Sequence, residues 1–169
     1  MNVDTFCRHL EHAVAAAWPE QRLETLAGEL ALFFRVDPHE VGLFKLETDG
    51  RMAVFVWPPH RMDTAIKIPV SSFTTSLISA TARKRQGSID NAFSGTKHLH
   101  MFEHALLDRE HCVPLQKVMT APAVKDDKLI WIVQISRKAK SLADAGPDFT
   151  DLELKQLEQI AQTLPELLL

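Results

Sequence analysis

Residues 115–137 read LQKVMTAPAVKDDKLIWIVQISR, and this stretch decides the fold. The segments 115–124 and 128–137 are rich in residues that favour strands, above all in the run 129–133. Between them lies Lys125-Asp126-Asp127, a polar trio typical of a tight turn. The stretch therefore predicts a β-hairpin whose second strand lies at the centre of a sheet.

A second hairpin is predicted upstream. The segments 41–47 and 51–57 are joined by residues 48–50, a Thr-Asp-Gly turn. Pro58 ends the second of these strands, because proline has no N–H to donate to a neighbouring strand. A short third strand is predicted over 65–68.

The section between the two hairpins predicts a helix. Ser71 and Ser72 are candidates for its N-cap, and the apolar residues that follow recur at helical spacing. Gly87 marks its end. A short strand over 88–93 and a short helix over 98–107 are predicted next.

Both ends of the chain predict amphipathic helices. Residues 1–36 carry apolar residues at helical spacing, with Pro19 either breaking one helix or opening a second. Residues 148–169 predict a final helix, in which Thr150 and Glu153 form a capping box. Two hairpins with helices around them indicate an α+β fold. We expect a central antiparallel sheet of about five or six strands, flanked by N- and C-terminal helices.

Composition limits the possible functions. The chain has 169 residues, and its net charge of −3 with a pI near 6.2 argues against a nucleic-acid binder. Residues 1–169 are expected to form a single domain. The sequence has neither a signal peptide nor an apolar stretch that could span a membrane. Its two cysteines, Cys7 and Cys112, predict reduced thiols and a cytoplasmic protein.

The order of these elements resembles the GAF domain family over essentially the whole chain. The residues that carry the resemblance are Val41–Leu46, Ile68-Pro69-Val70 leading into Ser71, Met119–Val124 with Asp127–Arg137, and Phe149-Thr150-Asp151. The resemblance implies a stand-alone GAF domain with its terminal helices together on one face. It also implies a ligand pocket bordered by the central helix and the segment 88–102. The residues expected to bind a ligand are Trp57, Phe73, Ser76, Asn91, Phe93, Met101 and Phe102.

The resemblance implies a non-catalytic sensory or regulatory module that binds a small ligand or a signalling protein. Apolar stripes on the terminal helices also favour a homodimer. The stripes are Phe6, Leu10 and Val14 on one helix and Leu157, Ile160 and Leu164 on the other. Residues 91–103 lack the pattern of cyclic-nucleotide-binding members, and two distant cysteines do not match the grouped cysteines of the members that reduce methionine sulfoxide.

A second hypothesis is a metal- or haem-binding sensor built on the segment His98–Cys112. If the segment is helical, His100 and His104 lie on one face at the i, i+4 spacing that a metal can bridge. His111 or Cys112 would supply a further ligand. The competing interpretation is that these side chains are solvated, and the sequence requires no cofactor.

A third hypothesis is a ligand-free domain for protein–protein interaction or dimerisation. The sequence contains no catalytic triad, phosphate-binding loop or paired carboxylates. We therefore expect no enzyme activity, with a redox-active Cys112 as a minor alternative.

Overall fold

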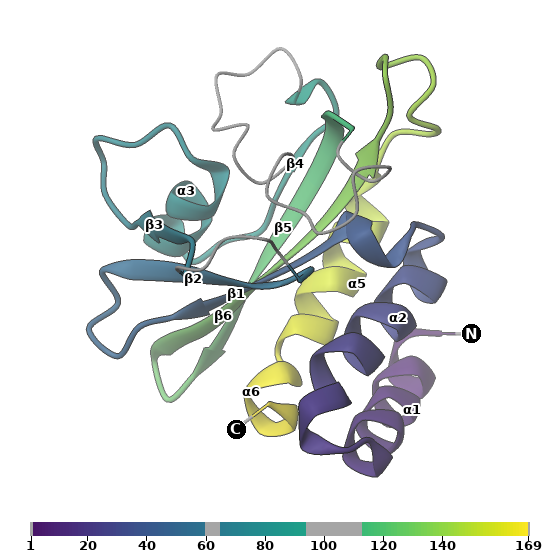
Figure 1. The fold of residues 1–169 in the computed structure, drawn as a ribbon, viewed down its shortest axis with the longest axis vertical. Helices are drawn as coiled ribbons and strands as arrows, with labels where there is room; N and C mark the ends of the chain where they lie inside the picture. Colours follow the sequence, from purple (N-terminus) through teal and green to yellow (C-terminus); the bar gives the residue numbers. More distant parts are fainter. Residues whose placement is uncertain (1, 60–64, 94–112, 169) are drawn as a thin grey trace.

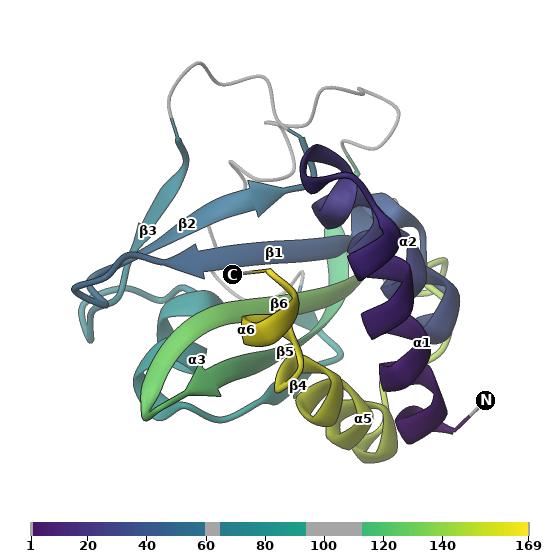
Figure 2. The ribbon, with the colours of Figure 1, turned by 90° about the horizontal axis from the view of Figure 1, so that it is seen from below.

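In a computed structural model of the chain, residues 2–59, 65–93 and 113–168 are described. Within these ranges a six-stranded sheet has the order β3-β2-β1-β6-β5-β4, and every neighbouring pair is antiparallel. Helices α1, α2 and α5 cover one face of the sheet, and α3 covers part of the other (Figure 1). The view turned by 90° shows the same layers (Figure 2). This arrangement confirms the predicted α+β class.

The strands, in chain order, are β1 Val41–Leu46, β2 Met52–Trp57, β3 Lys67–Pro69, β4 Ser88–Asp90, β5 Leu115–Lys125 and β6 Lys128–Lys138. Both predicted hairpins are confirmed. In the β5–β6 turn, Asp126 and Asp127 have positive φ angles of 50° and 57°, the backbone that a two-residue hairpin turn requires. In the β1–β2 turn, Gly50 has a φ of 70°.

The helices are α1 Val3–Ala16, α2 Arg22–Phe34, α3 Leu77–Lys84, α5 Asp151–Ala161 and α6 Leu164–Leu167, with short 3₁₀ turns η1 Pro19–Gln21 and η2 Pro38–Glu40. Pro19 opens η1, so the N-terminal region forms two helices rather than one. The capping box of Thr150 and Glu153 is present at the start of α5. Among the helices of the described ranges, none has the length and apolarity needed to cross a membrane.

The larger core lies between the sheet and the terminal helices. The two apolar stripes that favoured a dimer belong to this core. Phe6, Leu10 and Val14 of α1 are at most 1% exposed, and the stripe on α5 and α6 is fully buried. Both stripes are therefore buried inside the fold. The homodimer stays a prediction, and its interface would have to form on the outer faces of the helices.

The start of α3 differs from the prediction. Ser76, and not Ser71 or Ser72, is the N-cap, since its side chain accepts from the backbone N–H of Ser79. Ser71 binds Ser79 instead. Its N–H donates to Ser79 Oγ, and Ser79 Oγ donates to the Ser71 carbonyl, both at 2.9 Å. These bonds hold residues 71–76 as a loop against the helix, so the N-cap of α3 lies five residues after its first candidate, Ser71.

Three further boundaries differ. β3 runs over Lys67–Pro69 rather than 65–68, because an edge strand tolerates proline. β4 ends at Asp90 rather than at 93, where the Asp90 carboxylate accepts from the Ala92 N–H and turns the chain. α3 ends at Lys84. The helix predicted over 98–107 lies outside the described residues.

Among the described residues, β4 pairs with three residues on the outer edge of β5, residues 118–120. Farther along, Pro122 has no N–H to offer. The side chain of Gln162 donates to the Pro122 carbonyl at 3.0 Å and accepts from the Val124 N–H at 3.4 Å. A side chain that follows α5 therefore occupies the edge positions that a longer β4 would have occupied.

Candidate ligand site

A hollow lies on the face of the sheet opposite the terminal helices. Side chains alternate along β1, so Val41 and Leu43 enter the helix-side core while Gly42 and Phe44 face the other way. Phe44 packs with Ile78 of α3 in a separate core on that side. The hollow is lined by His39, Glu40, Val41, Gly42, Phe44, Phe55, Pro58, Leu115, Gln134, Ser136 and Lys138.

Gly42 and the side chain of Gln134 form the floor of the hollow. Gly42 is paired with Gln134 across the β1–β6 ladder. A Cβ atom at position 42 would lie 3.2 Å from Phe44 Cε2 and 3.3 Å from Gln134 Cβ. Glycine therefore leaves the Gln134 side chain room to lie across the strand. Within the described residues, that amide makes no hydrogen bond, so both its donor and its acceptor are available.

The polar rim is held in place by η2. Glu40 accepts from the N–H of Asp37 at 2.8 Å and from the N–H of Lys138 at 2.5 Å, so it ties η2 to the end of β6. Lys138 Nζ donates to the His39 carbonyl at 2.8 Å, and Ser136 Oγ donates to the Glu40 carbonyl at 2.9 Å. These bonds fix the polar side of the hollow.

The hollow has a limited capacity in this conformation. It contains about 340 Å³ of empty space, counting the part open to solvent, and about 20 Å³ of it admits the centre of a water molecule. That enclosed part suits one or two waters. A larger ligand needs a lining side chain to turn aside. Gln134 is a polar lining residue whose side chain no hydrogen bond within the described ranges holds.

The residues predicted to bind a ligand lie elsewhere. Trp57 contacts the helix-side core, and its indole Nε1 donates to the Pro38 carbonyl at 3.3 Å. Phe73 is 97% exposed, and Ser76 caps α3. Phe93 is buried in a small cluster with Leu115 and Val118.

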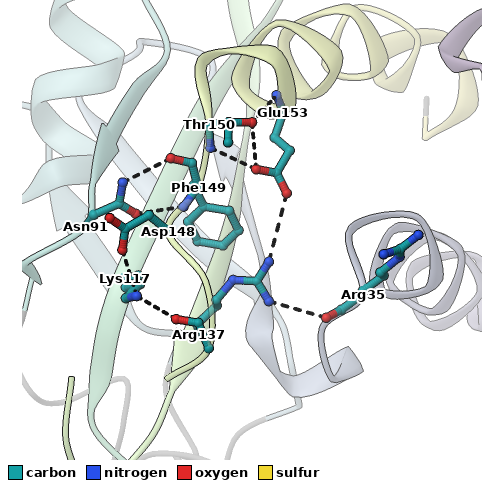
Figure 3. A network of polar contacts seen from close by, with 9 residues as sticks. Arg35, Asn91, Lys117, Arg137, Asp148, Phe149, Thr150 and Glu153 are labelled. Atoms are coloured by element: carbon teal, nitrogen blue, oxygen red, sulfur yellow. Dashed lines mark hydrogen bonds and ion pairs between the residues drawn. The ribbon is translucent and has the colours of Figure 1, made fainter. Parts of the chain in front are cut away.

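Asn91 ties two loops together. Its Nδ2 donates to the Phe149 carbonyl at 3.0 Å, and its Oδ1 accepts from the Phe149 N–H at 2.9 Å (Figure 3). Of the seven predicted residues, the five that the structure describes do not line the hollow. Met101 and Phe102 lie outside the described residues, and the ligand contacts of all seven residues stay a prediction.

The candidate metal ligands His100, His104, His111 and Cys112 also lie outside the described residues, as does the rest of the segment 98–112. Within the described ranges, no group of three or more His, Cys, Asp or Glu side chains could hold a metal ion. Cys7 is buried in α1, in the core on the helix side. The metal hypothesis stays a prediction.

Sequence reasoning missed the residues that form the floor and the rim. Two signals were present. Gln134 is an isolated polar residue within the apolar run of β6, and Gly42 interrupts an otherwise apolar strand, which marks a close approach of another group. Lys138 carried no such signal, because its partners, Glu40 and the His39 carbonyl, are distant in sequence.

Two buried cations lie on the helix side of the sheet (Figure 3). Lys117 Nζ donates to the Gly146 carbonyl at 2.6 Å and pairs with Asp148 at 2.7 Å. Arg137 is less completely paired. Its guanidinium lies 4.7 Å from the Phe149 ring centre, its Nη1 donates to the Arg35 carbonyl at 3.4 Å, and its Nη2 lies 3.9 Å from Glu153 Oε1.

Comparison with known proteins identifies the fold. No family model matches the sequence, and no curated protein matches it. Among solved structures, the chain is similar to the GAF domain of a phosphoenolpyruvate-protein phosphotransferase from Acinetobacter. The TM-score is 0.67 at 11% identity, covering 97% of this chain and 90% of that one.

Two further structures have the same fold. Free methionine-R-sulfoxide reductase from Neisseria meningitidis, solved with its substrate, matches at a TM-score of 0.63 and 16% identity, covering 98% of this chain and 87% of that one. The phycoerythrobilin-bound GAF domain of a cyanobacterial phytochrome matches at 0.61 and 13%, covering 99% and 94%. At such identities the likeness shows the fold.

The reductase corrects one expectation. The absence of catalytic motifs predicted that the chain is not an enzyme, and this prediction is contradicted by an enzyme among its structural neighbours. The error has a physical reason: a fold positions side chains but does not decide their chemistry, so one architecture serves binding and catalysis alike.

Proposed function

Because the chain has the fold of GAF domains, we propose that it is a sensory domain that binds a small polar molecule in the hollow over Gly42 and Gln134. The observation that carries this proposal is the Gln134 amide. It faces the hollow, glycine at position 42 leaves it room, and no hydrogen bond within the described residues occupies it. Polar groups that converge beside apolar walls are typical of ligand sites.

The lining indicates the chemistry of the ligand. Gln134 offers one donor group and one acceptor beside the hydroxyl of Ser136. The apolar part of the lining includes Phe44, Phe55 and Leu115. The proposed ligand therefore carries a group that both donates and accepts hydrogen bonds, such as an amide or a heterocycle edge, next to a small apolar part.

The same strands offer a route for the signal. Gln134 and Ser136 alternate along β6 with Val133 and Ile135, which belong to the helix-side core. A ligand that shifts Gln134 acts directly on strands that support α1, α2 and α5. In this proposal the outer faces of those helices pass the change to a second copy of the chain or to a signalling protein.

Native mass spectrometry of the freshly purified chain tests the proposal first, because a co-purified ligand adds a defined mass. If the chain is bare, a panel of small metabolites is screened by thermal shift. Gly42→Ala is then expected to weaken binding of any ligand found by at least about tenfold, since the new Cβ crowds Gln134. Gly28→Ala is the matched control, as nothing lies within 4 Å of a Cβ there.

Equal binding by the two alanine variants would show that the ligand binds elsewhere. A chain that is bare and also ignores every compound in the panel would favour the ligand-free interaction domain instead.

Thiol-dependent reduction of a small sulfoxide is a second candidate function, supported by the structural likeness to free methionine-R-sulfoxide reductase. The reaction would convert two thiols and a sulfoxide into a disulfide, a thioether and water. Cys7 is buried on the opposite side of the sheet from the hollow, so the nucleophile would be Cys112. Incubation with free methionine sulfoxide and dithiothreitol, followed by quantification of methionine, tests it. Turnover that persists in Cys112→Ser would contradict this role.

A further inference from the structure

A second pocket lies on the helix side of the sheet, away from the hollow. It is bordered by α1, α2, the end of β6 and the first turns of α5, and it holds about 820 Å³. That volume is within the range of small-molecule sites, about 300–1,000 Å³. Its walls include the apolar side chains of Leu32 and Phe33 and, from β6, the guanidinium of Arg137. We call it the helix-side pocket.

Arg137 has more donors than partners. The residue is only 9% exposed, yet within the part of the chain that the structure describes its Nε has no hydrogen-bond partner. The bond from Nη1 to the Arg35 carbonyl is long, at 3.4 Å, and Glu153 Oε1 lies 3.9 Å from Nη2, beyond hydrogen-bond distance. A buried charge normally needs closer partners than these, because it has lost its contact with water.

Glu153 cannot supply the missing contact without giving up another. Its Oε2 accepts from the Thr150 N–H and from the Thr150 hydroxyl, both at 2.8 Å, and these bonds form the capping box of α5. The carboxylate is held by the helix start, which leaves Oε1 at 3.9 Å from Arg137. The guanidinium therefore faces the pocket with its charge incompletely paired.

We propose that the helix-side pocket binds an organic carboxylate. One or both of its oxygens accept from the Nη groups of Arg137, and its apolar body lies against Leu32 and Phe33. The guanidinium matches a carboxylate because its N–H groups form a planar fork. Leu32 is 77% exposed, so an apolar body that covers it removes apolar surface from water. The lining contains two carboxylates of its own, and both have partners. Glu29 pairs with His9, and Glu153 accepts from the Thr150 N–H.

Two probes of the same shape test the charge. The ¹⁵N-labelled full chain is titrated with 4-phenylbutyrate and, separately, with the uncharged 4-phenylbutyramide. We expect saturable shifts at the backbone amides of Leu32, Phe33 and Gln156 with the acid, and at least about tenfold weaker binding of the amide. Equal binding of both probes would overturn the proposal, and so would shifts confined to Gly42 and Gln134 on the other face.

Four variants separate the charge, the apolar wall and the guanidinium of the site. Leu32→Glu places a negative charge at the pocket and is expected to weaken binding of 4-phenylbutyrate by at least about threefold more than the neutral Leu32→Gln. Trp18→Glu carries the same charge at an exposed position outside the lining and should bind normally. Arg137→Lys keeps the positive charge but loses the fork, so binding should fall by about fivefold or more. Identical affinities for Leu32→Glu and Leu32→Gln would contradict a carboxylate ligand even if Arg137→Lys fails to fold.

Discussion

At the scale of single residues, Cys7 is a thiol that the fold makes unreactive. Burial raises its pKa above the ordinary value of 9.0, and the carboxylates of Glu11 and Asp4 raise it further. The thiolate is the reactive form, so the side chain is both shielded and protonated at neutral pH. In the Cys112→Ser variant, where Cys7 is the remaining cysteine, we expect iodoacetamide at pH 7.5 to react at least about tenfold more slowly in the native chain than in urea.

The raised pKa also sets the direction of a pH effect. The folded chain holds the Cys7 proton more tightly than the unfolded chain. The stability that this provides is fully present below pH 9 and is lost as the pH rises through the folded-state pKa.

Equal alkylation rates in native and unfolded Cys112→Ser protein would contradict the burial of this thiol.

Trp57 shows what sequence reasoning cannot reach at this scale. Strict alternation along β2 would place it beside Phe55 and Ala53, on the side of the hollow. The β1–β2 register shifts between Leu43 and Phe44, so an extra residue of β2 bulges out and Trp57 turns into the helix-side core. No residue type in the strand signals that bulge, so the sequence could not show which side of the sheet Trp57 faces.

At the scale of elements, the link between β4 and the start of α5 depends on Asn91. Its amide makes a two-way bridge to the backbone of Phe149, a pairing that resembles one step of a β-ladder. Asn91→Ala leaves a partly buried N–H and C=O without partners, and we expect it to lower the free energy of unfolding by about 1–3 kcal/mol. Urea denaturation followed by tryptophan fluorescence measures the loss.

Asn91→Asp tests the donor of this bridge, since it keeps an acceptor for the Phe149 N–H but places a carboxylate oxygen against the Phe149 carbonyl. It should therefore also lower the free energy of unfolding at neutral pH. If both substitutions leave the urea midpoint unchanged, the bridge does not stabilise the native chain.

Local chemistry made some elements predictable and others not. The turn at Asp126 and Asp127 and the capping box at Thr150 are set by neighbouring residues, so the sequence revealed them. The start of α3 depends on Ser71 binding Ser79, eight residues away, rather than capping its own helix. Rules that consider only adjacent residues favoured the wrong serine.

At the scale of the whole molecule, the helix layer and the sheet share one core. Phe6 of α1 is 1% exposed, and its ring centre lies 4.3 Å from that of Phe33 in α2. Phe6→Ala removes a large buried side chain and is expected to lower the free energy of unfolding by about 3–5 kcal/mol. Trp18→Ala, at a residue that is 71% exposed, should change it by less than about 1 kcal/mol.

The way in which Phe6→Ala unfolds is as informative as its size. Circular dichroism at 222 nm and tryptophan fluorescence should lose their native signals together, because helices and sheet unfold as one unit. Early loss of helical signal at constant fluorescence would show that α1 detaches alone and that the core is divided.

The layers of the molecule were predictable because amphipathic periodicity decides which side of an element is buried. The candidate site was not predictable, because residues from η2, β1 and β6 meet in the hollow. Two of them, Glu40 and Ser136, are 96 residues apart in the sequence. Distances of this kind are set by tertiary packing. The sequence predicted the sheet but not the chemical groups that converge on it.

The side chain of Gln162 along the outer edge of β5 has a consequence for the protein in a crowded solution. An open strand edge is a template on which another chain can add a strand, and repeated addition leads to aggregates. Here Pro122 offers no N–H, and its carbonyl and the Val124 N–H are already bound by Gln162. This part of β5 therefore has little left with which to recruit a strand from a neighbouring chain.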